Sequence, residues 1–187
     1  MTIYIALLRG INVGGNNIIK MFDLKAVFEA IGLCEVKTYI QSGNVLFKSN
    51  DQEETLRKKI EDEIEKSFGF SVTVILRTAV ELKWIIQNCP FIKEVVLKAE
   101  ASSLGENLYV AFLTQKPLDE NIQRLNVYNN ESEEYLIKGR EIYLLFGNSI
   151  RNSKLASNLQ KLEVSVTVRN WKTINKLSIL AKTMEVL

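Results

Sequence analysis

Apolar positions along the chain change period several times, and the changes mark the expected elements. Residues 3–8 form a near-continuous apolar run, typical of a strand buried on both faces. Four apolar residues from Met21 to Ile31 then recur at helical spacing, and Gly32 stands where a helix commonly ends. Residues 36–40 and 45–48 are two further strands around a tight turn.

Two helix starts in the first half have the spacing of a capping box. Asp51 and Glu54 precede a helix whose inner face has apolar residues every fourth position, and Thr78 and Glu81 open the next helix. Between the two helices, residues 70–76 alternate and are rich in β-branched side chains, which predicts a strand. The first half therefore reads β-α-β-β-α-β-α.

The same order recurs in the second half. Residues 108–113 (Leu-Tyr-Val-Ala-Phe-Leu) echo residues 3–8, Gly139 lies between two strands as Gly43 does, and residues 165–168 repeat residues 71–74 letter for letter. We expect a weak helix at 117–127, a helix around 155–162 and a last helix after residue 170. Three matching strands in one order predict an internal duplication.

This order predicts an α+β fold made of two ferredoxin-like (α/β plait) units in tandem, each with an antiparallel sheet. Right-handed crossovers place the third strand between the first two, and the fourth strand beside the first. We expect a first unit at 1–90, a linker at 91–106 with a short helix at 92–99, and a second unit at 107–187.

Composition excludes several classes of chemistry. The 187 residues include no His, so Ser-His-Asp catalysis and His-ligated zinc are absent, and Cys34 and Cys89 cannot form a four-thiolate metal site. The net charge of +2 is too small to imply nucleic acid by itself. The short, interrupted apolar start is not typical of a signal peptide, no apolar run is long enough to span a membrane, and we expect a soluble cytoplasmic protein.

The predicted wiring brings a glycine-rich turn at 10–17 beside the hairpin at 41–44. A glycine-rich turn that enters a helix offers bare backbone N–H groups and the positive end of the helix dipole, which attract phosphate or carboxylate. The turn does not match the spacing of a P-loop or dinucleotide-binding motif. An alternative interpretation is that its glycines adopt positive φ and its asparagines cap the helix. The candidate ligand-binding residues are Arg9, Gly10, Asn12, Gly14, Gly15, Lys20, Gln41, Ser42 and Asn44.

A second candidate set lies where the third and fourth strands of the second unit end at one edge. Residues 150–187 contain seven basic and two acidic side chains, and cations at helix starts oppose the helix dipole. A bound anion would explain them, as would plain solvation of charged residues. Trp171 could stack on a ring or pack under the last helix. The members of this set are Ser153, Lys154, Arg169, Asn170 and Trp171.

Catalytic residues remain unassigned. Lys20, Lys154, Ser42, Ser153 and Tyr39 could act as acid, base or nucleophile, but no spacing joins them into a known constellation, and no metal site or cofactor is expected. An RNA-recognition module would carry stacking aromatic residues on its third strand, and neither half has that ring pattern.

Several segments of the sequence match motifs of a known family. Residues 6–15 (Ala-Leu-Leu-Arg-Gly-Ile-Asn-Val-Gly-Gly) and 38–44 (Thr-Tyr-Ile-Gln-Ser-Gly-Asn), with Lys20-Met21, Ser153-Lys-Leu155 and Arg169-Asn-Trp171, resemble the bacterial domain-of-unknown-function 1697 family. The resemblance covers nearly the whole chain and implies a two-part α/β-plait structure without an established activity. Members of that family often have Lys or Arg where this chain has Asn17, and a tyrosine-rich stretch where it has residues 144–146.

The leading hypothesis is a protein that binds a phosphate-bearing ligand between the two units. The ligand would be a nucleotide, a phosphorylated metabolite or a nucleic-acid backbone, held by cations from both halves. Two alternatives stay open: an enzyme acting on a phosphorylated substrate, and a non-catalytic protein-interaction module using a sheet edge or face. No membrane partner is expected, and the oligomeric state is not predicted.

Overall fold

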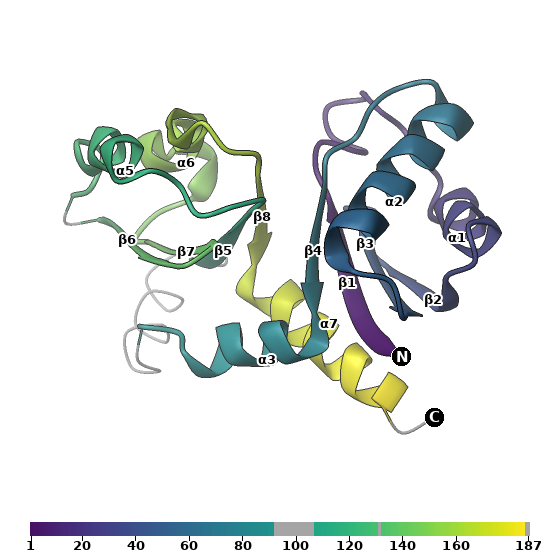
Figure 1. Cartoon of the computed structure of the whole chain (residues 1–187). Coiled ribbons are helices and arrows are strands. Elements are labelled where there is room, and N and C mark those ends of the chain that lie inside the picture. The colour runs from purple at the N-terminus through teal and green to yellow at the C-terminus, as the bar shows by residue number, and fades with distance from the viewer. Residues whose placement is uncertain (92–106, 131, 186–187) are drawn as a thin grey trace. The chain divides into compact units, whose positions relative to one another are not determined.

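The computed structural model of the chain describes residues 1–91, 107–130 and 132–185, which form two compact units (Figure 1). Residues 1–84 and 176–187 are grouped in the first unit, and residues 85–175 in the second. The predicted bounds were 1–90 and 107–187; in this grouping the second unit begins at Ile85, and the end of the last helix goes with the first unit. The predicted helix at 92–99 lies outside the described residues.

The first unit is built on a four-stranded antiparallel sheet with the order β2-β3-β1-β4. Its elements are β1 (Thr2–Leu8), α1 (Met21–Ala30), β2 (Cys34–Tyr39), β3 (Asn44–Ser49), α2 (Glu53–Phe68), β4 (Val74–Thr78) and the start of α3 (Ala79–Gln87). Residues 70–73, predicted to be strand, precede β4, whose first paired residue is Val74. The order confirms that the third strand lies between the first two.

One face of this sheet packs against α1 and α2. The core joins alternate residues of the strands, among them Tyr4, Ala6 and Phe47, to Leu24 and Phe28 of α1 and to the predicted apolar face of α2. Burying an apolar side chain of this size contributes about 1.5–3 kcal/mol. Strand β1 is buried on both faces after Thr2, as its continuous apolar run predicts.

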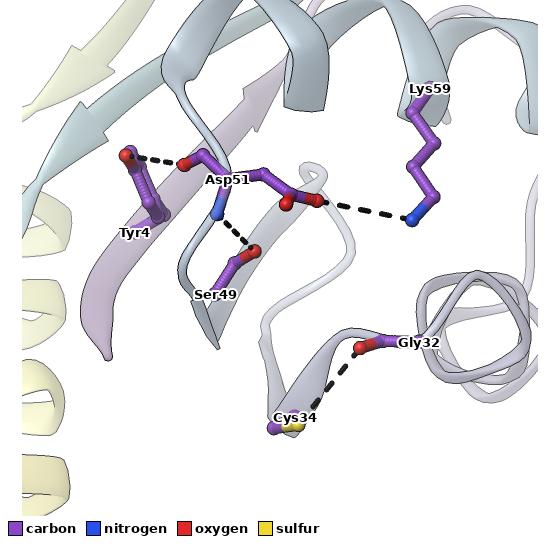
Figure 2. A network of polar contacts seen from close by, with 6 residues as sticks. All are labelled: Tyr4, Gly32, Cys34, Ser49, Asp51 and Lys59. Atoms are coloured by element: carbon purple, nitrogen blue, oxygen red, sulfur yellow. Dashed lines mark hydrogen bonds and ion pairs between the residues drawn. The ribbon is translucent and has the colours of Figure 1, made fainter.

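The predicted capping box at Asp51 and Glu54 is wrong. Helix α2 begins at Glu53 with Gln52 at its N-cap, and no side chain caps it. Asp51 instead lies in a polar network that joins β3 and β1, shown in Figure 2. Its backbone N–H donates to Ser49 Oγ at 3.1 Å, and its carbonyl oxygen accepts from the Tyr4 hydroxyl at 3.0 Å. Asp51 is therefore oriented by the sheet.

The second unit has a four-stranded antiparallel sheet with the order β6-β7-β5-β8. Its elements are β5 (Leu108–Leu113), α5 (Asp119–Asn126), β6 (Glu133–Lys138), β7 (Glu141–Phe146), η1 (Ile150–Asn152), α6 (Lys154–Ser157), η2 (Leu159–Leu162), β8 (Val166–Asn170) and the start of α7 (Trp171–Glu185). The predicted helix around 155–162 is thus broken into short turns. Helices α5 and α6 cover one face of the sheet (Figure 1).

The identical tetrapeptides at 71–74 and 165–168 do not occupy the same register. Leu8 at the end of β1 pairs with Val74, whereas Leu113 at the end of β5 pairs with Val166. If the identical tetrapeptides were aligned, Leu113 would pair with Val168, two residues later than Val166. Because side chains in a strand alternate with a period of two, this shift leaves the same residue types facing the core.

Taken together, the described residues form an α+β fold with two antiparallel four-stranded sheets and helices. Among them, no helix is both long and apolar enough to cross a membrane.

Candidate functional site

The glycine-rich loop, residues 9–20, leads from the end of β1 to the start of α1. Two of its side chains, Ile11 and Ile19, are buried in the core, each about 2% exposed or less. The backbone N–H of Arg9 donates to the Thr73 carbonyl at 3.0 Å, which fixes the start of the loop beside β4. The apolar residues at both ends therefore anchor a loop whose middle is exposed.

Asn12 holds this loop closed. Its amide nitrogen Nδ2 donates to the carbonyl oxygens of Ile19 at 2.9 Å and Gln41 at 2.8 Å, and its Oδ1 accepts from the Ile19 N–H at 2.8 Å. Its backbone has φ 55°, a left-handed conformation that Asn tolerates better than most residues. Asn12 is therefore a structural residue, and its side chain has little capacity left for the ligand predicted above.

Gly14 and Gly15 form the exposed tip of the loop. They have φ values of 60° and 80°, and a Cβ atom built on either would meet no atom within 4 Å. The positive φ explains why glycine stands at both positions. This supports the interpretation that the glycines serve the conformation of the turn. Both glycines are exposed, so this loop conformation is compatible with an anion site.

The hairpin at 40–44 lies beside the loop, as the predicted wiring requires. The Leu8 N–H donates to the Gly43 carbonyl at 2.9 Å, and a Cβ atom on Gly43 would come within 2.8 Å of both Ile11 Cδ1 and Leu8 Cβ. Here glycine is needed for close packing as well as for φ 71°. The prediction that these two loops meet is confirmed.

Two of the polar candidates in the hairpin also have structural roles. Asn44 is fully buried, and its Nδ2 donates to the Tyr39 carbonyl at 3.1 Å and to Ser42 Oγ at 2.9 Å. Gln41 contributes its carbonyl oxygen to the loop, while its side chain is exposed. Of the hairpin residues predicted to bind a ligand, Gln41 keeps an accessible side chain.

Helix α1 begins at the end of the loop without a side-chain cap. Lys20 occupies the N-cap position with extended backbone, φ −70° and ψ 134°, and makes no capping hydrogen bond. The helix start is held instead by buried Ile19 and Leu24, which stand at the positions of a hydrophobic staple. A lysine here opposes the helix dipole, and the first N–H groups of the helix are left without a capping acceptor.

The exposed surface around this helix start is both basic and apolar. Arg9 and Lys20 are exposed and make no ion pair in the part of the chain that the structure describes. Four apolar side chains of the same loop, helix start and hairpin are exposed by 49–82%: Val13, Ile18, Phe22 and Ile40. Sequence reasoning missed these four because apolar residues were assigned to the core.

Ile40 is the most unusual of these residues. It has φ 49°, a conformation rare for a β-branched side chain, and its side chain is 49% exposed. Strained residues of this kind persist where surrounding structure holds them, often at binding sites. The pattern Tyr-Ile-Gln-Ser-Gly-Asn contains no signal for this strain, because the residue type there is an ordinary strand residue.

In the second unit, Ser153 caps a short helix. Its Oγ accepts from the Ala156 N–H and donates to Glu133 Oε2, both at 2.9 Å, and the side chain is buried. Asn170 likewise accepts from the Thr173 N–H at 2.8 Å at the start of α7, where Trp171 is half-buried. Both polar candidates therefore hold local structure, while Lys154 is exposed.

Arg169 is buried within the sheet, with only 8% of its surface exposed. Its Nη1 donates to Thr167 Oγ1 at 2.8 Å and to the Val168 carbonyl at 2.9 Å. Burial lowers the pKa of the guanidinium to about 10, which leaves it charged at neutral pH. The neighbouring Val168 packs against the core that α6 covers, so Arg169 lies on the other face of the sheet.

The second candidate set does not form one site within its unit. Ser153 is bonded to Glu133 in the edge strand β6, and Arg169 belongs to β8 at the other edge. Three interstrand spacings separate these edges, about 14 Å, and the two side chains lie on opposite faces of the sheet. Convergence of cations from the two units in one cleft stays a prediction.

A comparison with models of protein families shows which family the chain belongs to. A family model described as "Protein of unknown function (DUF1697)" matches residues 1–143. The chain belongs to the DUF1697 family. The resemblance inferred from its motifs is confirmed, and the first candidate set lies inside the matched residues, while Ser153, Lys154 and residues 169–171 lie beyond them.

The DUF1697 chain is also similar to a solved structure, described as that of the conserved bacterial protein SP0830 from Streptococcus pneumoniae. The two are 27% identical with a TM-score of 0.73, and the match covers 96% of this chain and 98% of the other. Among curated proteins, none matches the chain.

Three catalytic candidates of the first unit stand at the end of β2, in the hairpin and at the start of α1: Tyr39, Ser42 and Lys20. Ser42 accepts a hydrogen bond from Asn44, and Lys20 stands at the helix start. Within the described residues, no three His, Cys, Asp or Glu side chains are grouped so that they could hold a metal ion. At this DUF1697 site, Arg9 and Lys20 are exposed cations, and helix α1 begins without a side-chain cap.

Proposed function

We propose that this DUF1697 protein binds a phosphate-bearing ligand at the glycine-rich loop and the start of α1. The observation that carries the proposal is Lys20 at an N-cap position with no capping side chain. A helix N-terminus attracts anions, and its N–H groups are strong donors to a phosphate oxygen. Arg9, exposed at the other end of the same loop, supplies a second cation.

The surroundings of the loop favour a ligand that carries an apolar or ring-shaped body beside its phosphate. Phe22 is 82% exposed in the first turn of α1, and Ile18 is 68% exposed just before it. A nucleotide or a phosphorylated metabolite could bury such side chains while its phosphate occupies the helix start. A nucleic-acid backbone would use the same donors, with a base against Phe22.

Binding can be tested by isothermal titration and thermal unfolding with inorganic phosphate and adenosine monophosphate at constant ionic strength. A ligand present at a hundredfold excess over its dissociation constant stabilises the fold by about 2.7 kcal/mol. The double variant Arg9→Ala/Lys20→Ala should raise the dissociation constant about tenfold or more, because two charge-assisted contacts are lost. Lys58→Ala, an exposed lysine of α2, is the matched control. Absence of stabilisation by either ligand would remove the proposal.

We also infer that the two units are duplicated ferredoxin-like folds. Supporting this, the strand orders β2-β3-β1-β4 and β6-β7-β5-β8 correspond one to one. The hydrogen bond from Leu8 N–H to the Gly43 carbonyl has a counterpart from Leu113 N–H to the Arg140 carbonyl. Thr78 and Asn170 then end the fourth strands, and each caps the next helix with its side chain.

A cytoplasmic location is part of the proposal. Cys34 and Cys89 are free thiols, which suits a reducing compartment. Labelling of the protein in intact and fractionated cells would test the location directly.

A further inference from the structure

Strand β6 forms one edge of the second sheet, and its ladder with β7 is regular. All six residues from Glu133 to Lys138 are paired in an unbroken register. The corresponding edge strand of the first sheet is different: β2 has a register shift between Cys34 and Lys37, and Glu35 there has φ 51°. Bulges of this kind blunt an edge against pairing with another strand, and β6 has none.

The backbone groups that β6 turns outward can be identified from the ladder. Phe146 donates its N–H to Asn107, so it faces away from β6, and its neighbour Leu145 faces β6 opposite Glu134. Backbone direction alternates along a strand, so Glu133, Tyr135 and Ile137 face outward. Glu133 exchanges two backbone hydrogen bonds with Asn130, which leaves Tyr135 and Ile137. In the part of the chain that the structure describes, their outward N–H and carbonyl groups have no hydrogen-bond partner.

The strand is self-complementary when it meets a second copy antiparallel to itself. With Leu136 opposite Leu136, each Tyr135 stands opposite Ile137 of the second copy, and both residues can exchange two backbone hydrogen bonds. The same register places each Glu134 opposite Lys138 of the second copy. Opposite charges in directly facing positions stabilise an antiparallel pair. A shift by two residues toward the start of the strand would set Glu134 opposite Leu136 and lose both charge pairs.

The side chains on the face of β6 away from the α5–α6 core suit this arrangement. Leu136 is 40% exposed, Glu134 is exposed, and Lys138 lies half-buried with its ammonium 2.8 Å from the Asn88 carbonyl. On the core face, Tyr135 and Ile137 pack against the cluster beneath α5 and α6. Each would meet the other type of residue across the new ladder, a favourable aromatic and β-branched pair.

We propose that the β6 edge pairs with β6 of a second copy of this chain, in the register centred on Leu136, to give a two-fold symmetric dimer with one continuous eight-stranded sheet. Such an interface is isologous, because the same strand contributes both sides. This inference is independent of the phosphate proposal, since it involves a different unit and different residues.

The experiment is sedimentation velocity on the full chain over about 1 µM to 1 mM, with a charge-swap series. The wild type should dimerise, and Glu134→Lys should raise the dissociation constant about tenfold or more, because two attractive pairs become two repulsive ones. The double variant Glu134→Lys/Lys138→Glu should return it to near the wild-type value. Glu65→Lys, which makes the same charge change at an exposed position of α2, should have no effect.

Hydrogen–deuterium exchange gives a second readout. The outward amides of Tyr135 and Ile137 should become protected as concentration rises in the wild type and stay exchangeable in Glu134→Lys. Circular dichroism of each variant separates dissociation from unfolding. A wild type that is monomeric throughout, a dimer that Glu134→Lys leaves intact, or a double variant as weak as the single one would each overturn the proposal.

Discussion

The Asn12 amide donates to the Gln41 carbonyl oxygen at 2.8 Å, although 29 residues separate the two in the sequence. This contact joins the glycine-rich loop to the hairpin that ends β2. The same amide also donates to the Ile19 carbonyl just before α1. One side chain thus sets the position of the loop, the hairpin and the helix start relative to each other, and the proposed anion site depends on it.

Asn12→Ala should therefore lower the free energy of unfolding by about 2–4 kcal/mol. Three hydrogen bonds are lost at about 0.5–1.5 kcal/mol each, and Ala is strained at φ 55°. Urea denaturation measures the change. Asn16→Ala is the control, because Asn16 is exposed in the same loop and its side chain makes no hydrogen bond to any residue that the structure describes. Equal effects of the two substitutions would mean that Asn12 does not hold the loop.

Gly43→Ala should be much more damaging than Gly14→Ala, although both glycines have positive φ. A Cβ atom at position 43 meets Leu8 and Ile11 at 2.8 Å, whereas one at position 14 meets nothing within 4 Å. We expect a loss of about 3 kcal/mol or more at position 43, from overpacking added to backbone strain, and about 1 kcal/mol at position 14. Thermal unfolding of both variants checks this, and a similar loss at both positions would contradict the close packing.

Hydrogen bonds between two residues of one short motif could be predicted from the sequence. Thr78 and Glu81 form the expected capping box: the Thr78 N–H donates to Glu81 Oε2 at 2.7 Å, and the Glu81 N–H donates to Thr78 Oγ1 at 3.1 Å. The same spacing failed at Asp51, where Ser49 and Tyr4 fix the residue from outside the helix. Long-range contacts decide such cases, and spacing does not contain them.

In the candidate site, too, some features could be predicted from the sequence and others could not. Strand order was enough to place the loop beside the hairpin, because connectivity determines which strand ends share an edge. It was not enough to separate exposed cations from buried ones. Arg9 and Arg169 both stand near strand ends, yet Arg169 is buried among residues of the sheet. The asparagines chosen as ligand donors proved to be loop and helix caps, since the backbone groups that they satisfy are not visible in the sequence.

Lys20→Ser should stabilise the free protein while weakening phosphate binding. Serine is a preferred N-cap residue, and its hydroxyl could accept from a helix N–H that has no cap now, so we expect a gain of about 1 kcal/mol in urea denaturation. Removal of the cation should raise the dissociation constant for phosphate in titration. If the serine variant is less stable, Lys20 supports the fold. If it binds phosphate as tightly as the wild type, the site lies elsewhere.

Tyr143→Phe should reduce the loss of stability at alkaline pH. Burial, with smaller contributions from Cys89 and Glu141, raises the pKa of Tyr143 well above its ordinary value of 10, and its hydroxyl donates to the Ile85 carbonyl at 2.7 Å. Above pH 10 the unfolded chain releases this proton while the folded chain keeps it. The stability that Tyr143 contributes is therefore complete below pH 10 and declines above it, by up to about 1.4 kcal/mol per pH unit.

At pH 7 the variant should be less stable by about 1 kcal/mol, because the hydrogen bond is lost. Urea denaturation at pH 7 and between pH 10 and 11.5 should show the stabilities of the two proteins converging above pH 10 and crossing before pH 11.5, with partly exposed Tyr39→Phe as a control that runs parallel to the wild type. A difference between wild type and Tyr143→Phe that stays constant with pH would show that the Tyr143 proton is not held by the fold.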